Sequence, residues 1–292
     1  MRLLPTFAAL TLMASTCAQQ SPQAQSPAAV AQSYLGFDAN EYPGDDLLPA
    51  LRKQFTFTGY WLNNPPGADH NPWLGKREAL LRNGFGFLVV FNGRLDKEIL
   101  KAQKAGKKPA AFAVEDAAAA VAAARHEGFP AHTILFLDQE EGGRLLLEQA
   151  DYLLGWTEAI ARTDYRPGVY TSGLPVSDGT GPDGKPATIT TIQDIRARVA
   201  TAHLHQIAFW VYQDACPPAP GCVVNPTHPP TPDLSGTLQA DAWQFAQSPR
   251  RRSFTQSCGA SYNRDGNCYA PGLTQYQLDL SSSASPDPSH GR

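Results

Sequence analysis

Residues 134–141 read ILFLDQEE, an apolar run followed directly by a cluster of acidic side chains. Such a run is typical of a buried strand, and we predict a strand over 134–138. Asp138 and Glu140 are two residues apart on an extended segment, so their side chains point to the same side. The stretch therefore predicts a buried strand whose end presents two neighbouring carboxyl groups.

The same kind of strand signal recurs along the chain, with helical patterns between most of the segments. The further strands are expected over 34–39, 55–61, 86–91, 166–171, 207–213, 240–246 and 276–280, and the helices over 45–54, 76–83, 115–127, 144–163 and 191–203. Alternating strands and helices favour a parallel sheet. Eight strands in roughly 250 residues favour an α/β fold of the TIM type, a (β/α)8 barrel, with a doubly wound open sheet as the alternative.

The last third of this barrel is expected to be irregular. The stretches 214–239 and 247–275 are long, rich in Pro and Gly, and carry four cysteines, Cys216, Cys222, Cys258 and Cys268. An even number of cysteines in an exported chain favours disulfides, and of three connectivities we favour 216–222 and 258–268. Loops closed by disulfides would then replace helices. A zinc site is disfavoured because there is no CxxC pair.

Charge and composition limit the possible functions. The chain has 292 residues with 24 Lys+Arg and 27 Asp+Glu, a formal net charge of −3. This balance excludes a basic nucleic-acid-binding surface as the main feature, so no nucleic-acid partner is expected. An aromatic content of 10% excludes disorder throughout. No apolar stretch reaches ~18–20 residues, so no transmembrane span is expected.

Both ends of the chain differ in composition from the middle. Residues 1–18 (MRLLPTFAALTLMASTCA) have the charge, apolar run and small residues of a signal peptide. Residues 19–33 are predicted to be a disordered linker, 34–280 the barrel domain, and 281–292 (SSSASPDPSHGR) a disordered tail. In an alternative interpretation Cys17 is a lipidated cysteine. Either way we expect a secreted, periplasmic or envelope protein, free or lipid-anchored, and a monomer.

Acidic residues stand at the predicted ends of three strands. They are Asp38, Asp138 with Glu140 just beyond it, and Asp279. Barrel enzymes hold their reactive groups at such ends. Carboxyl groups forced together repel, so one pKa rises and that group can donate a proton, while the others stay ionised and stabilise positive charge at a sugar carbon. This pattern predicts glycosidase chemistry, and the alternative is a structural role as loop or capping acids.

Aromatic and amide side chains share those strand ends. Sugar rings pack their C–H faces on aromatic rings, and their hydroxyls bind polar groups. The predicted substrate-binding residues are Tyr42, Trp61, Tyr170, Trp210, Gln213, Trp243 and Gln244. For the aromatic ones, a place in the barrel core is the alternative. Trp210 shares a strand face with Tyr212, and Trp243 with Phe245.

Six short motifs in order resemble glycoside hydrolase family 25, the lysozyme-type muramidases. They are GFD (36–38), FLDQE (136–140), GVYTS (168–172), FWVYQ (209–213), AWQF (242–245) and QLDL (277–280). The opening GFD together with FTGYWL (57–62) is similar to a glycoside-hydrolase-like domain family of unknown function, found in exported bacterial proteins and similar in fold to family 25. The resemblance spans nearly all of 34–280.

The resemblance implies a role for each acidic residue. Glu140 would be the general acid, and Asp138 would orient or stabilise an N-acetyl group that acts as internal nucleophile. Asp38 and Asp279 would complete an acidic floor, with no metal and no cofactor. The chain is thus expected to cleave a bacterial cell-wall-type glycan such as peptidoglycan. The alternative is a non-catalytic carbohydrate-binding or envelope-associated module on the same barrel.

Overall fold

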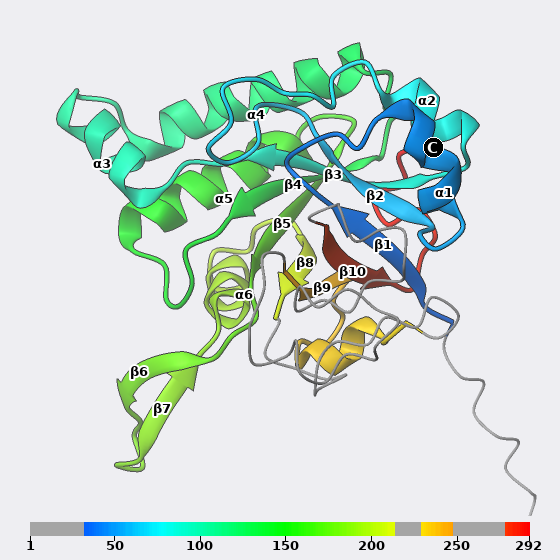
Figure 1. The fold of residues 1–292 in the computed structure, drawn as a ribbon. Coiled ribbons are helices and arrows are strands. Elements are labelled where there is room, and N and C mark those ends of the chain that lie inside the picture. Colours follow the sequence, from blue (N-terminus) through cyan, green and yellow to red (C-terminus); the bar gives the residue numbers. More distant parts are fainter. Residues whose placement is uncertain (1–31, 214–228, 248–277) are drawn as a thin grey trace, which may run out of the picture. The chain divides into compact units, whose positions relative to one another are not determined.

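The computed structural model describes residues 32–213, 229–247 and 278–292. Within these residues eight strands form a closed barrel in the order β1-β10-β9-β8-β5-β4-β3-β2 (Figure 1). The strands are β1 Tyr34–Asp38, β2 Phe57–Trp61, β3 Gly86–Asn92, β4 Ile134–Gln139, β5 Arg166–Ser172, β8 Ala208–Tyr212, β9 Ala242–Ala246 and β10 Asp279–Ser283. Each overlaps a segment predicted from the sequence, so the α/β barrel is confirmed.

The expectation of a wholly parallel sheet is wrong at the last strand. β10 runs antiparallel to both of its neighbours, β1 and β9. A parallel neighbour needs a crossover that returns the chain to the other end of the barrel, whereas an antiparallel neighbour does not. Residues 247 and 278 accordingly lie at the same end of the barrel. The predicted signal peptide, Cys17 and all four cysteines of the predicted disulfides lie outside the described residues.

Helices cover the outside of the barrel on one side. They are α1 Leu48–Arg52, α2 Arg77–Arg82, α3 Asp96–Lys104, α4 Pro109–His126, α5 Leu147–Ala161 and α6 Thr191–Thr201, with 3-10 turns η1 Asp45–Leu47 and η2 Pro232–Ser235. α5 packs on β4 and β5, and α4 packs against α5 (Figure 1). α3 was not predicted from the sequence. Ile99 is the one residue of that helix that is buried, so the helix has no repeating apolar face that a sequence pattern could reveal. The sequence-based prediction also started α4 too late, since the helix begins at Pro109, which suits a first helical position.

A two-stranded hairpin was also not predicted. β6 Val176–Thr180 pairs with β7 Pro186–Ile189, between β5 and α6 in the chain, and the ribbon extends away from the barrel (Figure 1). Its residues are exposed or half-buried, and the turn is rich in Gly and Asp. A hairpin that buries no apolar face leaves no alternating pattern in the sequence.

The inward-facing positions of the strands form layers. Phe136 and Trp210 pack edge to face inside the barrel, with ring centroids 6.1 Å apart. Successive inward positions on a strand are two residues apart. The next inward residues are therefore Asp138 above Phe136 and Tyr212 above Trp210. The strand period alone therefore gives an apolar layer around Phe136 and Trp210 and a polar layer nearer the carboxyl ends of these strands.

The prediction of a disordered tail over 281–292 is wrong. Ser281–Ser283 belong to β10 and are buried. Beyond them, Asp287 Oδ1 accepts a hydrogen bond from Phe87 N at 2.9 Å, and Ser289 Oγ accepts one from Val89 N at 2.8 Å. Ser289 O accepts from Ile134 N at 2.8 Å. The polar composition was misleading because these serine and aspartate groups accept hydrogen bonds from Phe87 and Val89 in β3 and from the first residue of β4.

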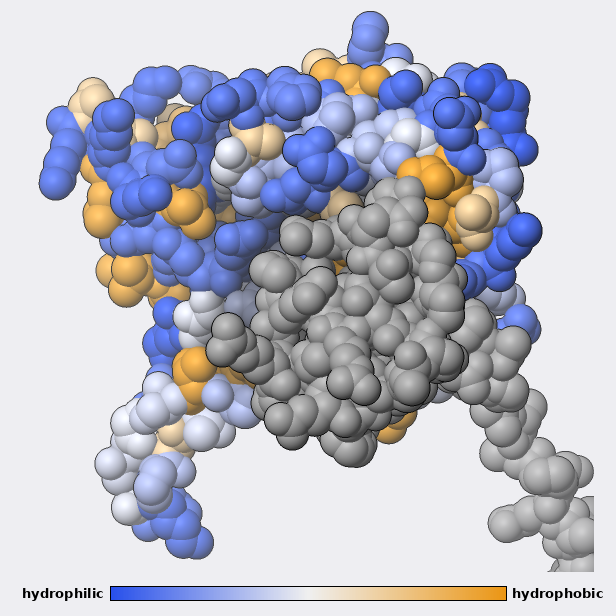
Figure 2. Space-filling model, in the orientation of Figure 1, coloured by the Kyte–Doolittle hydropathy of each residue, from blue (hydrophilic) through white to orange (hydrophobic). Residues whose placement is uncertain are grey.

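The face of the molecule drawn in Figure 2 carries hydrophobic residues in separate small areas. Figure 2 shows a largely hydrophilic face over α3 and α4, interrupted by small hydrophobic areas. Among the described residues, the large exposed apolar side chains include Val114, Leu147 and Leu238. Within the same parts of the chain, no helix has the length and apolar character needed to cross a membrane.

Candidate functional site

The predicted acidic residues gather at one end of the barrel. Asp38 is the last residue of β1 and is paired in register with Asp279, the first residue of the antiparallel β10. Asp138 lies near the end of β4, and Glu140 follows that strand directly. The reversed direction of β10 therefore places Asp279 at the same rim as the carboxyl ends of the parallel strands.

Asp38 fits its position because residue 59 is a glycine. A Cβ atom on Gly59 would lie 2.6 Å from the Cβ of Asp38, closer than real Cβ atoms approach. The Asp38 side chain is buried, with 7% of the residue exposed, and both its oxygens accept hydrogen bonds from Gln244 Nε2, at 3.2 and 3.1 Å. Burial raises the pKa of Asp38 to about 7, against the lowering effect of the Gln244 bond.

Asp138 is the most enclosed of these carboxyl groups, with 4% of the residue exposed. Its Oδ1 is buried and has no hydrogen-bond partner in the described part of the chain. Burial raises its pKa well above the ordinary value, and the charges of Glu140 and Asp38 raise it further. A buried carboxyl oxygen without a partner is costly unless it is protonated or receives a hydrogen bond from a ligand.

Glu140 is exposed and borders a cleft of about 260 Å³ together with Asp138. The cleft is also lined by Pro66 and Gly67 from the loop after β2 and by Asn92 at the end of β3. Partial desolvation in this cleft raises the pKa of Glu140, and the charge of Glu141 adds to the rise. A carboxyl group that is accessible and also has a raised pKa suits proton donation to a ligand.

The neighbouring Glu141 has a structural place instead. Its carboxylate accepts hydrogen bonds from Asp96 N, at 3.1 and 3.0 Å, and from Gln149 Nε2 at 2.7 Å. These bonds tie the loop after β4 to the first residue of α3 and to the first turn of α5. Glu141 therefore holds the loop that carries Glu140.

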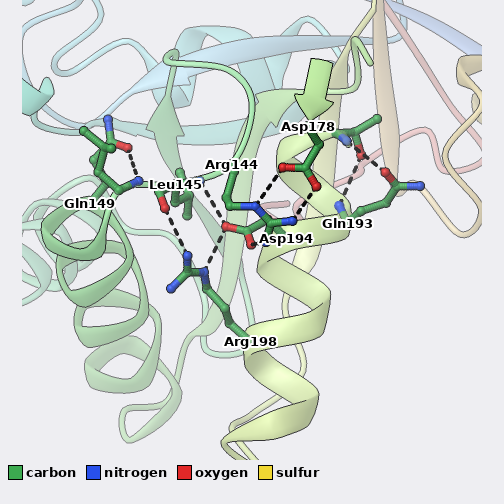
Figure 3. A network of polar contacts seen from close by, with 9 residues as sticks. Arg144, Leu145, Gln149, Asp178, Gln193, Asp194 and Arg198 are labelled. Atoms are coloured by element: carbon green, nitrogen blue, oxygen red, sulfur yellow. Dashed lines mark hydrogen bonds and ion pairs between the residues drawn. The ribbon is translucent and has the colours of Figure 1, made fainter. Parts of the chain in front are cut away.

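The far side of the same loop is fixed by a buried carboxylate (Figure 3). Asp194 on α6 accepts a hydrogen bond from Leu145 N at 3.0 Å and pairs with Arg144 at 3.1 Å and Arg198 at 2.9 Å. Arg144 also pairs with Asp178 of the β6–β7 hairpin at 2.6 Å. The loop between Glu140 and α5 is thus held at two points, which keeps Glu140 in one place relative to the barrel.

The predicted aromatic residues are mostly enclosed within the fold. Trp210 lies against Tyr170, with ring centroids 4.6 Å apart, and its Nε1 donates to Ser281 Oγ at 3.1 Å. Trp61 is buried and donates from Nε1 to Ala39 O at 3.1 Å. Both tryptophans therefore support the walls of the site.

Two further predicted residues, Trp243 and Tyr42, are turned away from the carboxyl groups or separated from them, whereas Gln244 lies among them. Trp243 and Gln244 are adjacent on β9, so their side chains point to opposite faces, and Gln244 faces Asp38. Trp243 is fully buried on the other face, where its Nε1 donates to the backbone oxygen of Gln213 at 2.9 Å. Tyr42 does not line the cleft, and its hydroxyl donates to an Asp45 carboxylate oxygen at 2.6 Å.

Tyr212 is the aromatic residue that the sequence-based selection left out. It is half-buried at the end of β8, its ring centroid lies 5.6 Å from that of Tyr170, and its hydroxyl donates to Glu140 O at 3.1 Å. The alternation that puts Tyr212 on the face of Trp210 was the signal that pointed to it. Among the aromatic side chains at this rim, Tyr212 is well placed to contact a ligand beside Glu140.

The buried Asp38 predicts a dependence of stability on pH. Its pKa of about 7 exceeds the ordinary 3.8, so between these values the folded chain keeps a proton that the unfolded chain releases. The free energy of unfolding should therefore fall as the pH rises from about 4 to 7, by up to about 1.4 kcal/mol per pH unit for this group. In the Asp38→Asn variant this contribution should vanish. Urea denaturation at several pH values measures it, and equal slopes for both proteins would refute it.

Among the described residues, no group of three or more His, Cys, Asp or Glu side chains is arranged to hold a metal ion. Asp38 and Glu140 are near enough to Asp138 for their charges to raise its pKa. The part of the site that the structure describes is thus a set of carboxyl and amide groups that can exchange protons and hydrogen bonds.

Comparison with solved structures finds several proteins that the chain resembles, and one of them has a TM-score above 0.5. An uncharacterised protein from B. stearothermophilus is 18% identical with a TM-score of 0.51, over 85% of this chain and 94% of that one. The spore cortex lytic enzyme SleM of Clostridium perfringens is 16% identical with a TM-score of 0.48, over 90% and 70%. The Tat-secreted protein Rv2525c of Mycobacterium tuberculosis is 14% identical with a TM-score of 0.47, over 88% and 97%.

No curated protein matches the chain. The model of one domain family does match, over residues 55–256, and it carries the description "Rv2525c-like, glycoside hydrolase-like domain". The matched residues include the strand with Asp138 and the motifs around Tyr170 and Gln244. The predicted resemblance to a glycoside-hydrolase-like domain family is thereby confirmed. Since the match extends over more than half of the sequence, the chain belongs to the Rv2525c-like, glycoside hydrolase-like domain family.

Proposed function

We propose that this protein is a glycosidase that cleaves a bacterial cell-wall-type glycan in the cleft beside Glu140. The observation that carries the proposal is the pairing of two unlike carboxyl groups. Glu140 is accessible with a raised pKa, and Asp138 next to it is buried with an unpartnered oxygen. Two carboxyl groups in different environments can divide the roles of proton donor and charge stabiliser.

In the proposed reaction Glu140 gives its proton to the oxygen of the glycosidic bond as that bond to the sugar carbon breaks. Asp138 Oδ1 accepts the N–H of an acetamido group, so that the acetamido oxygen attacks the same carbon. Water then opens the resulting ring and loses a proton to the Glu140 carboxylate, which restores the acid. Asp38 and Asp279 supply negative charge near the developing positive centre. Each of these roles follows the family 25 resemblance of the motifs.

The first test uses purified peptidoglycan as the probe, because the motifs resemble those of muramidases. The chain without residues 1–18 is incubated with the insoluble polymer, and soluble products are identified by mass spectrometry. New saccharide fragments are expected, and their ends identify the bond that is cleaved. Retention on the polymer without fragments would contradict the glycosidase and favour a binding module. If no fragments appear and the protein is not retained on the polymer, peptidoglycan is excluded as the substrate.

We also infer that the protein is exported, from the signal-peptide pattern of residues 1–18. The intact mass of the protein recovered from an expressing bacterium tests this inference. A mass that lacks the first 18 residues indicates a free secreted form. A mass that starts at Cys17 and carries acyl chains indicates a lipoprotein. A full-length mass in the cytoplasm would contradict export.

A further inference from the structure

The side-chain amide of Gln244 lies at the centre of a network that joins three parallel strands and β10. Its Nε2 donates to both oxygens of Asp38, at 3.2 and 3.1 Å, and lies 3.5 Å from Asp279 Oδ2. Its Oε1 accepts from the Tyr170 hydroxyl at 2.7 Å and from Gln247 Nε2 at 3.0 Å. Only 1% of Gln244 is exposed. Both ends of the amide are used inside the protein, which leaves little of it for a glycan.

The neighbours also decide which way the amide points. The amide nitrogen faces Asp38, and the ionised form of that carboxyl group favours this orientation because it can only accept hydrogen bonds. The amide oxygen faces Gln247, whose Nε2 donates to it, and this agrees with the same orientation. Tyr170, the third partner, is fixed by its ring contacts with Trp210 and Tyr212. The Gln244 amide therefore has one orientation, with its nitrogen toward Asp38.

Asp38 has few other sources of stabilisation. Among the described residues no Arg, Lys or His forms an ion pair with it, and the carboxyl groups of Asp138 and Asp279 stand close by. The Gln244 bond lowers the pKa of Asp38, while burial raises it. Hydrogen bonds to the charged form are what favour ionisation of a buried carboxyl group.

We propose that Gln244 is a positioning residue, which holds the Asp38 carboxylate in one direction and keeps it available as an ionised group at the floor of the site. It acts through Asp38 and makes no contact with the glycan itself. Its consequence for catalysis rests on the proposed function. Its effect on Asp38, however, can be measured without any substrate.

The test follows the Asp38 carboxyl carbon by ¹³C NMR in protein labelled at aspartate, with Asp38→Asn used to assign the signal. In wild type we expect an apparent pKa of about 7. In Gln244→Met, which keeps the size but removes the donor, it should rise by about one unit or more. Gln244→Glu keeps an acceptor for Tyr170 but replaces the donor with a carboxyl group, and it should raise the pKa as well. The second variant answers the question if the first does not fold.

Gln247→Met is the matched control, because it removes a contact at the oxygen end of the same amide. It should leave the apparent pKa of Asp38 within a few tenths of a unit of wild type. The unmodified chain gives a further measurement, since the Gln244 Nε2 proton signals should shift with the same apparent pKa as Asp38. An unchanged pKa in the Gln244 variants, or an equal rise in Gln247→Met, would overturn the proposal.

Cleavage gives a separate result. If wild type cleaves peptidoglycan, Gln244→Met should move the acidic limb of its pH–rate profile upward with Asp38 and lower kcat more than it changes KM. If wild type cleaves nothing, the NMR titration still decides the role of Gln244, and the proposed function alone fails. If cleavage occurs and its acidic limb does not move in Gln244→Met, the positioning role fails.

Discussion

Glu140→Gln is expected to lower the rate of glycan cleavage by about 10²–10⁴-fold, the usual contribution of a general acid. Glutamine keeps the shape of the side chain and has no acidic proton to give to the leaving oxygen. The cleft itself should remain, because Tyr212 bonds to the backbone oxygen of residue 140. Binding to peptidoglycan should therefore persist while soluble fragments disappear. A time course of fragments measured by mass spectrometry, with a pull-down on the polymer, separates the two effects.

Glu141→Gln provides the control at the adjacent position. Its carboxylate is occupied by Asp96 N and Gln149 Nε2, and a glutamine oxygen can still accept one of these bonds. Cleavage should stay within a few-fold of wild type, with a loss of stability of about 1 kcal/mol. Removing the Glu141 charge should also lower the pKa of Glu140, so the alkaline limb of cleavage should move slightly to lower pH. Equal activity of Glu140→Gln and wild type would show that Glu140 is not the acid.

Most strands of the barrel were predictable because they are short apolar runs, and β1, β3 and β4 each end in a polar residue. Strand period two then placed Asp138 and Glu140 on one side, and barrel geometry placed Asp38 near them. The same period explains an error, since Trp243 and Gln244 are neighbours on one strand and cannot face one ligand. That conflict follows from the strand period alone.

The role of Gln244 could not be predicted in this way. Its partners Asp38 and Tyr170 are distant in sequence, and only strand order brings them together. The direction of β10 was hidden for a similar reason, because pairing depends on how the chain returns and not on the strand's own residues. α3 and the β6–β7 hairpin bury too little apolar surface to leave a pattern. Contacts at a distance in sequence and elements without an apolar face thus account for much of what was missed.

Deletion of residues 284–292 is expected to lower the free energy of unfolding by roughly 5 kcal/mol. Phe87 N, Val89 N and Ile134 N would lose their acceptors, and Arg77 would lose its bond to Gly291 O. Each lost partner of a buried donor costs about 1–3 kcal/mol. Since small domains have only about 5–15 kcal/mol in total, the shortened barrel should be close to unfolding at 25 °C. Urea denaturation followed by tryptophan fluorescence measures the loss.

Two point variants test whether the loss comes from this contact. Ser289→Ala removes the acceptor of Val89 N and leaves the two backbone bonds of Ser289, so it should cost about 1–3 kcal/mol. Gly86→Ala should act from the opposite side, because its Cβ would lie 2.1 Å from Pro286 O and force the segment away from β3. It should therefore reproduce a large part of the deletion's effect, and it should add little to the deletion itself. If the deletion lowers the free energy of unfolding by less than about 1 kcal/mol, the barrel does not depend on residues 284–292 to hold the beginnings of β3 and β4.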